Sequence, residues 1–307
     1  MTSKTLSLTT ICLLAYGGAM FNAQASPTSS LKTSLTPEKF HFKYNLHKSL
    51  PDAWVTEFKK KMDFLEELLP ITSNINQVFT DPFMNVYAWK TGETNPFPEK
   101  PGISGSSISG SSMILEMSAD SFSNGDVQRV VHEYFHVYQI GLSKDAMMPK
   151  WLIEGGANAF EEIDYQQYEG KRALDQELEN NVSKYVFTNP KLFEKYQTSS
   201  NDPAGKQMDI NYGSSTFMVL ALVKELRKQG ISEQRAFEMV FRDFWIENSK
   251  QRRISRENLE WEKSFETVFK ISIETFYSRL MSKYTHAGFK EVLPSKTLEV
   301  QQIFVAK

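Results

Sequence analysis

The chain has 307 residues, of which 40% are hydrophobic and 23% are charged, so it is long enough and apolar enough to bury a globular core. Its formal net charge of −2 gives no sign of the basic surface that nucleic acids or anionic membranes attract. We therefore expect no nucleic-acid partner.

Residues 1–25 differ in character from the rest of the chain. Lys4 precedes an apolar run from Leu6 to Phe21, and an A-x-A site ends at Ala25. This order is typical of a secretory signal peptide, cleaved here after Ala25, and it predicts export to a bacterial periplasm or to the medium. An uncleaved membrane anchor is the alternative interpretation. The single cysteine, Cys12, lies in this segment, so the mature chain would have no disulfide and no membrane span.

The first part of the mature chain is predicted to be rich in strands. Residues 26–45 form a loose leader or a first edge strand. A helix follows from Asp52, with apolar residues at 54, 58, 62, 65 and 69 on one face, and Pro70 ends it. The alternation of FMNVYAWK, residues 83–90, predicts a strand, residues 91–112 a loop, and MILEM, residues 113–117, another strand.

The second part is predicted to be helical, and its last residues, 297–306, are predicted to form a final strand. The helical segments are 126–140, 151–165, 171–187, 213–229, 231–246 and, in pieces, 256–284. Strands early and helices late indicate an α+β fold. We expect one domain over 26–307, with a strand-rich part (26–120) and a helical part (121–290) that carries the functional site.

The sequence VVHEYFHVYQ, residues 130–139, has two histidines four residues apart. Helical geometry places residues i and i+4 on one face, so His132 and His136 can bind one ion at about 2.0–2.1 Å. Glu133 lies about 100° around the helix from His132 and can reach a water on that ion, as a general base does in zinc peptidases. The alternative is a surface helix with two histidines and no metal.

A catalytic zinc needs three protein ligands and a water, whereas a closed structural site usually includes cysteine, which the mature chain lacks. The next helical pattern begins at Trp151, and its first carboxylate is Glu154, after the 17 residues 137–153. This spacing allows a second, antiparallel helix to bring Glu154 to the metal. A helix-start carboxylate is the other interpretation, and the small pair Gly155-Gly156 would allow close packing against the first helix.

HExxH followed by W-L-x-E-G-x-A resembles the gluzincins, and most closely the aminopeptidase N superfamily and its peptidase MA-like relatives. The matching residues run from His132 to Val137, with Gln139, and from Pro149 to Ala157. The resemblance implies a thermolysin-like catalytic domain that binds one Zn²⁺ and cleaves a peptide or protein substrate. It also implies that His132, His136 and Glu154 are the ligands and that Glu133 is the catalytic base.

The same resemblance suggests roles for residues further along. In the family a glutamate placed like Glu161, seven residues after Glu154, contacts a zinc histidine and fixes the tautomer of its imidazole, and Asn158 is the competing candidate. A solvated helix face is the alternative for both. A tyrosine placed like Tyr212, just before an apolar helix, donates to the oxyanion of the intermediate in the family.

Two departures from the family pattern limit these expectations. The family often has Y-x-K-G where this chain has Tyr212-Gly213-Ser214-Ser215, so a packing tyrosine is the alternative, with Tyr134, Tyr138 and Tyr185 as weaker substitutes. The G-x-M-E-N motif of the aminopeptidases is missing from 105–117, which makes aminopeptidase activity doubtful.

Three functions therefore stay open. The first is an exported zinc peptidase, in which a strand such as Ser112–Met117 would bind an extended peptide by edge pairing. The second is a non-catalytic peptide- or partner-binding protein on the same fold, although a binding protein has no need of Glu133. The third is a hydrolase of cell-wall amides. The sequence leaves the oligomeric state open.

Overall fold

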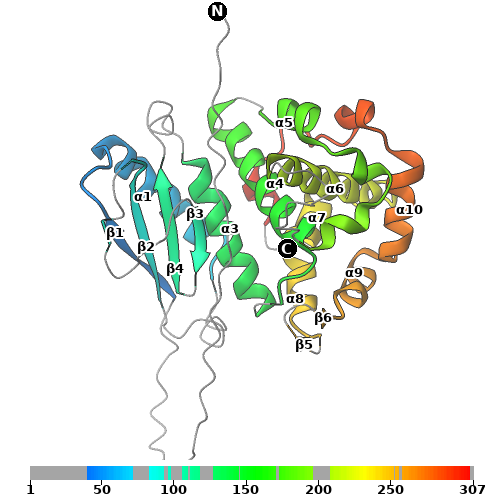
Figure 1. The fold of residues 1–307 in the computed structure, drawn as a ribbon, viewed down its shortest axis with the longest axis horizontal. Helices are drawn as coiled ribbons and strands as arrows, with labels where there is room; N and C mark the ends of the chain where they lie inside the picture. Colours follow the sequence, from blue (N-terminus) through cyan, green and yellow to red (C-terminus); the bar gives the residue numbers. More distant parts are fainter. Residues whose placement is uncertain are drawn as a thin grey trace, which may run out of the picture.

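The computed structural model describes residues 40–71, 83–92, 96–97, 106–109, 111–117, 127–144, 146–170, 173–195, 208–251, 253–255 and 258–304. The predicted signal peptide, its cleavage site and residues 26–39 lie outside this set. The fold is α+β, as predicted: a small sheet near the N-terminus is followed by a mainly helical half, and helix α3 runs between them (Figure 1).

The sheet has four strands in the order β1-β2-β4-β3. Strands β1 (His41–Leu46), β2 (Phe83–Lys90) and β4 (Ser112–Met117) are parallel, and β3 (Ser106–Ser109) is antiparallel to β4. The predictions of β2 and β4 are confirmed, but the loop predicted over 91–112 is wrong where it contains β3. Because β3 reads SSIS, it has little strand propensity and forms through its backbone pairing with β4.

Helix α1 (Asp52–Leu68) confirms the predicted amphipathic helix, and Leu69 lies at its C-terminal cap, before Pro70. Its buried side chains, Trp54, Phe58, Met62 and Leu65, repeat at helical spacing and belong to the main hydrophobic core. Each fully buried apolar side chain of this size contributes about 1.5–3 kcal/mol. Helix α1 also packs against α3, so the core of the sheet half is continuous with the helix that carries the histidines.

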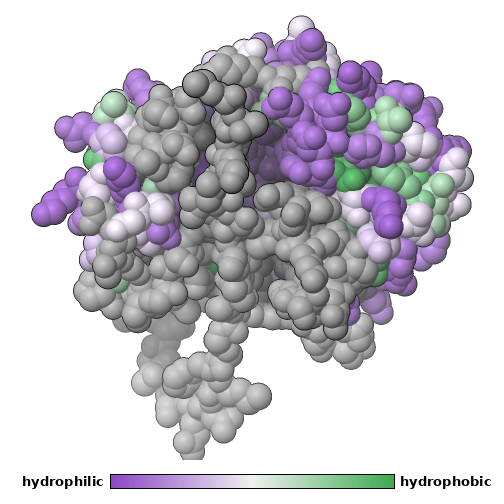
Figure 2. All heavy atoms as spheres, turned by 45° about the horizontal axis from the view of Figure 1, so that its top comes forward, coloured by the Kyte–Doolittle hydropathy of each residue, from purple (hydrophilic) through white to green (hydrophobic). Residues whose placement is uncertain are grey.

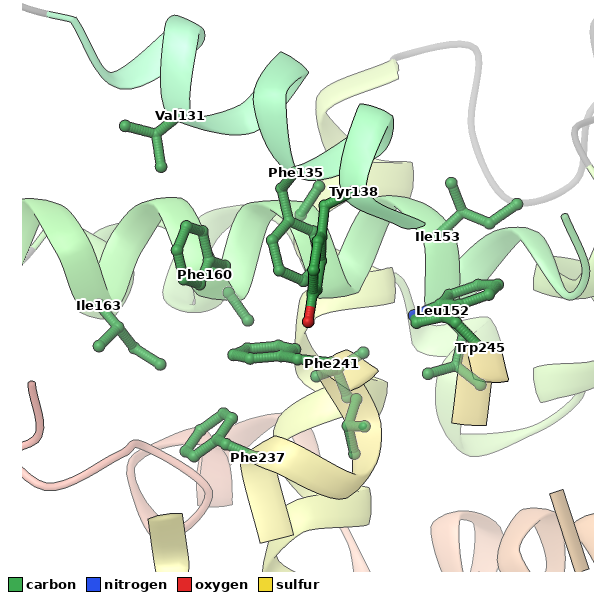
Figure 3. Close-up of a cluster of buried hydrophobic side chains, with 14 of the residues drawn as sticks. Val131, Phe135, Tyr138, Leu152, Ile153, Phe160, Ile163, Phe237, Phe241 and Trp245 are labelled. Carbon is green, nitrogen blue, oxygen red and sulfur yellow. The ribbon is translucent and has the colours of Figure 1, made fainter. Parts of the chain in front are cut away.

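Helices α3 (Gln128–Ser143) and α4 (Lys150–Glu169) confirm the two helices predicted around the motifs. They pack through aromatic side chains that also meet the π-helical turn η4 (Met239–Asp243), as Figure 3 shows. The rings of Phe135 and Phe160 stack with centroids 4.7 Å apart, and Phe241 meets Phe135 edge-on at 5.2 Å. This dry core holds the two helices at one crossing, which positions the polar residues of their other faces.

The rest of the helical half is divided more finely than predicted. Its elements are α5 (Leu174–Asn181), η2 (Lys184–Phe187), η3 (Pro190–Glu194), α6 (Met208–Lys228), α7 (Glu233–Glu238), η4, α8 (Phe244–Asn248), β5 (Arg253–Ser255), β6 (Asn258–Leu259), α9 (Trp261–Phe269), α10 (Ile273–Lys283), η5 (His286–Glu291) and α11 (Val300–Ile303). One prediction fails here, and another holds only in part. The helix predicted over 171–187 breaks at Val182, whose backbone is extended. Within 256–284, which was predicted as helix in pieces, residues 258–259 form strand β6, and helices α9 and α10 follow as predicted.

The predicted C-terminal strand is wrong as well, because residues 300–303 form helix α11. A capping box starts this helix: Glu299 and Gln302 each accept from the other's backbone N–H. Val300 and Ile303 are both buried and share one face at i, i+3, so a single helical turn buries both. The apolar pattern of this segment is consistent with a strand or a helix, and the capping contacts decide for the helix.

The glycine pair after Glu154 serves two different contacts. A Cβ on Gly155 would overlap the backbone carbonyl of Ser215, so α4 and α6 touch backbone to backbone at this point. A Cβ on Gly156 would lie 3.2 Å from Nε2 of Gln139 and 3.7 Å from the Phe135 ring, both on α3. The predicted close packing against the metal helix is therefore confirmed for Gly156, whereas Gly155 allows the approach of α6.

Hydrophilic side chains cover most of the coloured surface of the helical half in Figure 2, with small hydrophobic areas between them. Large apolar side chains that are more than a third exposed are, within the described segments, Tyr168, Ile246 and Met281. Among the described helices, none combines the length and the hydropathy needed to cross a bilayer.

Candidate metal centre

Helices α3 and α4 bring two histidines and a glutamate to one buried point. His132 Nε2 and His136 Nε2 lie 3.1 Å apart, and Glu154 Oε2 lies 3.4 Å from the first and 3.3 Å from the second. All three residues are less than a tenth exposed. They form a group able to hold a metal ion, with one ligand atom from each residue.

The spacing of these three atoms fits a tetrahedral metal. Ligand atoms bound at 2.0–2.1 Å to a tetrahedral ion are about 3.3–3.4 Å apart; the two separations from Glu154 match this range, and the 3.1 Å between the histidine nitrogens is slightly shorter. Two imidazole nitrogens and one carboxylate oxygen form the ligand set of several catalytic zinc sites, in which the fourth position is left to water or substrate. The residues present therefore fit a zinc ion.

Buried charge around this point also favours a cation. Burial by itself would lower the pKa of His132, but hydrogen bonds to the carboxylates of Glu154 and Glu161 outweigh it and raise that pKa to about 10. Burial would raise the pKa of Glu154, and its contacts with both histidines instead hold that pKa well below its usual range. A proton on His132 and a metal ion thus stabilise the same buried carboxylates.

Glu133 lies beside the ligands but is not one of the three that converge. Its side chain is 2% exposed, and burial raises the pKa of its carboxyl, an effect that the nearby His132 and His136 oppose. A raised pKa makes a carboxylate a better acceptor for a proton from water. This position and this environment suit a general base.

Glu161, rather than Asn158, contacts a histidine. Glu161 Oε2 lies 3.0 Å from Nδ1 of His132, on the side of the ring opposite Nε2. Asn158 points away: its Nδ2 donates to Glu177 Oε1 at 2.9 Å and to Thr216 Oγ1 at 3.0 Å. The alternative of a solvated face applies to neither residue, since both are partly buried and make these contacts.

His136 has a partner of its own, the glutamine that follows it in the same motif. Gln139, fully buried and one turn further along α3, places Oε1 2.9 Å from Nδ1 of His136. Its Nε2 donates to the backbone carbonyl of Ile153 at 3.1 Å. The i+3 spacing could have indicated the contact between Gln139 and His136 from the sequence. The contact with the Ile153 carbonyl depends on how α3 and α4 cross, which the sequence does not show.

Tyr212 lies beside the metal-binding group. Its ring and that of His132 are 6.0 Å apart at centroids and nearly perpendicular. Tyr212 lies inside α6, which begins at Met208, and not before the helix as predicted. The three weaker substitutes have other contacts. Tyr134 donates to the carbonyl of Leu69, the Tyr138 ring packs edge-on to Phe304, and the Tyr185 ring lies 5.6 Å from Nζ of Lys184.

The fold and the site together define an α+β protein with a buried His-His-Glu group that fits a metal ion. A comparison with protein-family models found no match, and searches of curated proteins and of solved structures returned no significant similarity.

Proposed function

We propose that the chain is an exported, zinc-dependent hydrolase of the gluzincin type that cleaves peptide bonds. The observation that carries the proposal is the convergence of His132, His136 and Glu154, with ligand atoms 3.1–3.4 Å apart, beside the buried carboxyl of Glu133. Export rests on the N-terminal sequence alone, and the gluzincin assignment rests on the two motifs together with this geometry.

Each residue of the site has a distinct task in this proposal. His132, His136 and Glu154 would hold the zinc, and zinc, when bound, acts as a Lewis acid that lowers the pKa of water to about 7. Glu133 takes the proton from the attacking water and returns it to the leaving amine. Its burial supports this cycle, because a carboxyl with a raised pKa accepts the proton more readily than an exposed one.

Tyr212 supplies the remaining donor. A phenol next to the ligands can donate to the carbonyl oxygen of the substrate as negative charge develops there. Its placement follows from close packing of α5 against α6: a Cβ on the adjacent Gly213 would come within 2.8 Å of the Asn181 side chain, and Ser214 Oγ accepts from the Ser183 backbone.

An extended substrate would pair with the edge of the sheet at β3. The prediction that a peptide pairs with Ser112–Met117 is wrong, because that strand is β4, which pairs with β2 on one side and β3 on the other. In the described sheet β3 is an outer strand, and it packs against α3, the helix of the two histidines. Main-chain pairing there would serve peptides of varied sequence.

The experiment that tests the proposal is the metal content of the purified mature chain, with His132→Ala as the comparison. We expect close to one zinc per chain by elemental analysis, absent from the variant, and hydrolysis of a mixed peptide library that stops on chelation. No zinc in either protein after zinc is supplied would contradict the proposal. Zinc without peptide cleavage, but with cleavage of cell-wall amides, would move the substrate to that class.

Replacement of Tyr212 by phenylalanine tests the oxyanion role separately. Loss of one such donor lowers kcat by about 10²-fold, and we expect this with zinc content and KM nearly unchanged. Tyr134→Phe is the matched control, because that hydroxyl belongs to the same helix as the two histidines but donates to the Leu69 carbonyl. An unaltered kcat in Tyr212→Phe would return this residue to a packing role.

A further inference from the structure

We propose that Gln139 is a positioning residue, whose side-chain amide uses the Ile153 carbonyl to hold His136 in the tautomer that leaves Nε2 free for a metal ion. The inference rests on the metal site proposed above, and it assigns a role to a residue outside the ligands, the base and the carboxylate behind His132.

The amide of Gln139 connects two ligands that come from different helices. Oε1 lies 2.9 Å from Nδ1 of His136, and Nε2 lies 3.1 Å from the carbonyl of Ile153, the residue directly before Glu154. Gln139 is fully buried, so water does not compete for these two contacts. One side chain on α3 thus ties the second histidine to the turn of α4 that carries the third ligand.

The direction of each hydrogen bond follows from chemistry. A backbone carbonyl only accepts, so the NH₂ group of Gln139 must face Ile153 and the amide oxygen must face His136. The amide oxygen also only accepts, so Nδ1 of His136 must carry the hydrogen. A neutral imidazole has one N–H, and its lone pair therefore lies on Nε2, the atom 3.3 Å from Glu154 Oε2.

The reverse orientation of the amide is unfavourable at both ends. It would set the amide oxygen against the Ile153 carbonyl, so that two acceptors face each other at about 3.1 Å in the buried interior and neither has a donor. It would also place the hydrogen of His136 on Nε2 and block metal binding there. The backbone of α4 thereby selects the tautomer of a residue on α3.

Gly156 provides the space that this arrangement needs. A Cβ at position 156 would lie 3.2 Å from Nε2 of Gln139, closer than ordinary van der Waals contact, and would press on the amide where it donates to Ile153. The absence of a side chain on this face of α4 lets the amide lie between the helices. This contact gives the second glycine after Glu154 a purpose distinct from that of the first.

The partner of the other histidine shows why an amide is required here. Glu161 supports His132 through a carboxylate, which only accepts and has no need to donate to a carbonyl. Gln139 must accept from His136 and donate to Ile153 at once, and a carboxylate of the same shape cannot do both. Gln139→Glu should therefore fail even though it keeps the size of the side chain and the acceptor for His136.

The test compares Gln139→Glu and Gln139→Met in the full mature chain. Zn²⁺ affinity is measured by competition with a chelator, and thermal unfolding of the metal-free proteins is recorded beside it. We expect both variants to bind zinc about 10–100-fold more weakly than the wild type. Asn248→Ala is the matched control. Asn248, on α8, is a fully buried amide that donates to the carbonyls of Ala146 and Met148 in the segment connecting α3 to α4, and it does not contact a ligand.

The control should lose stability and keep its zinc affinity. A zinc affinity within threefold of wild type in both Gln139 variants would overturn the inference and leave the proposed metal site intact. A loss of affinity in Asn248→Ala equal to that of the Gln139 variants would also overturn it, because general loosening of the α3–α4 packing would then explain the effect.

A spectroscopic measurement covers the case in which a variant does not fold or the wild type binds no zinc. Nitrogen-15 NMR of the metal-free wild-type chain reports which ring nitrogen of His136 carries the hydrogen. Hydrogen on Nδ1, shifting toward a mixture in Gln139→Glu, supports the inference; hydrogen on Nε2 with none on Nδ1 in the wild type overturns it. Failure of the wild type to bind zinc contradicts the proposed function, whereas the NMR measurement tests the role of Gln139 without zinc. The two proposals can therefore fail separately.

Discussion

Replacing Glu133 with glutamine is expected to lower kcat by about 10³-fold while the zinc stays bound. The amide keeps the shape of the side chain but cannot take a proton from water, so the step that generates the nucleophile loses its base. Glu133 follows His132 and is buried beside the ligands without being one of them, so its removal spares the metal-binding group. The measurement is kcat on a peptide substrate together with zinc content on the same sample.

Glu225→Gln is the matched control for that experiment. Glu225 is as deeply buried as Glu133, at 2% exposed, but its carboxylate contacts Arg279 at 2.9 Å and Tyr284 at 2.7 Å in a charge network of α6 and α10. Its replacement should lower the free energy of unfolding and leave kcat unchanged. Full activity in Glu133→Gln would show that another group is the base, and loss of zinc in that variant would mean that Glu133 serves the site structurally.

Removal of the third ligand should have the second large effect. We expect Glu154→Ala to weaken zinc binding by more than about 100-fold, because two histidines alone leave a tetrahedral ion with half of its coordination to solvent. The readout is zinc retained after dialysis against a weak chelator. The metal-free variant should stay folded, since the hydrophobic packing of Phe135, Phe160 and Phe241 is untouched.

Asn158→Ala provides the comparison on the same helix. Asn158 is one turn after Glu154, but it donates to Glu177 and Thr216 and not to a histidine. Its replacement should leave zinc retention unchanged. Equal zinc content in Glu154→Ala and wild type would remove Glu154 from the ligand set, and zinc loss in Asn158→Ala would mean that the contact to α5 and α6 also supports the site.

The choice between Asn158 and Glu161 shows where local pattern stops being informative. Both lie near the face of Glu154 on one helix, and their directions differ by about 60° around its axis. Sequence spacing cannot choose between them, because the choice depends on how α4 is rotated against α3. The stacked rings of Phe135 and Phe160 and the glycine contacts set that rotation, and they turn Glu161 toward Nδ1 of His132.

Dependence on contacts with other residues also explains two wrong predictions outside the site, those for strand β3 and for the C-terminal segment. Strand β3 has the sequence of a loop and becomes a strand through backbone hydrogen bonds to β4, which the residues 106–109 do not encode in their own pattern. The C-terminal run has an apolar pattern that fits a strand, and the capping contacts of Glu299 and Gln302 make it a helical turn instead.

The sequence by itself determined the α+β order, the long helices around the motifs, and the pairing of His132 with His136. It did so because helical periodicity and the i, i+4 relation are local and need no knowledge of neighbours. Tertiary structure alone decided that Glu154 Oε2 meets both histidines, that β4 is internal to the sheet, and that Gln139 spans two helices. These facts depend on the crossing of α3 and α4, which is set by side-chain packing between segments distant along the chain.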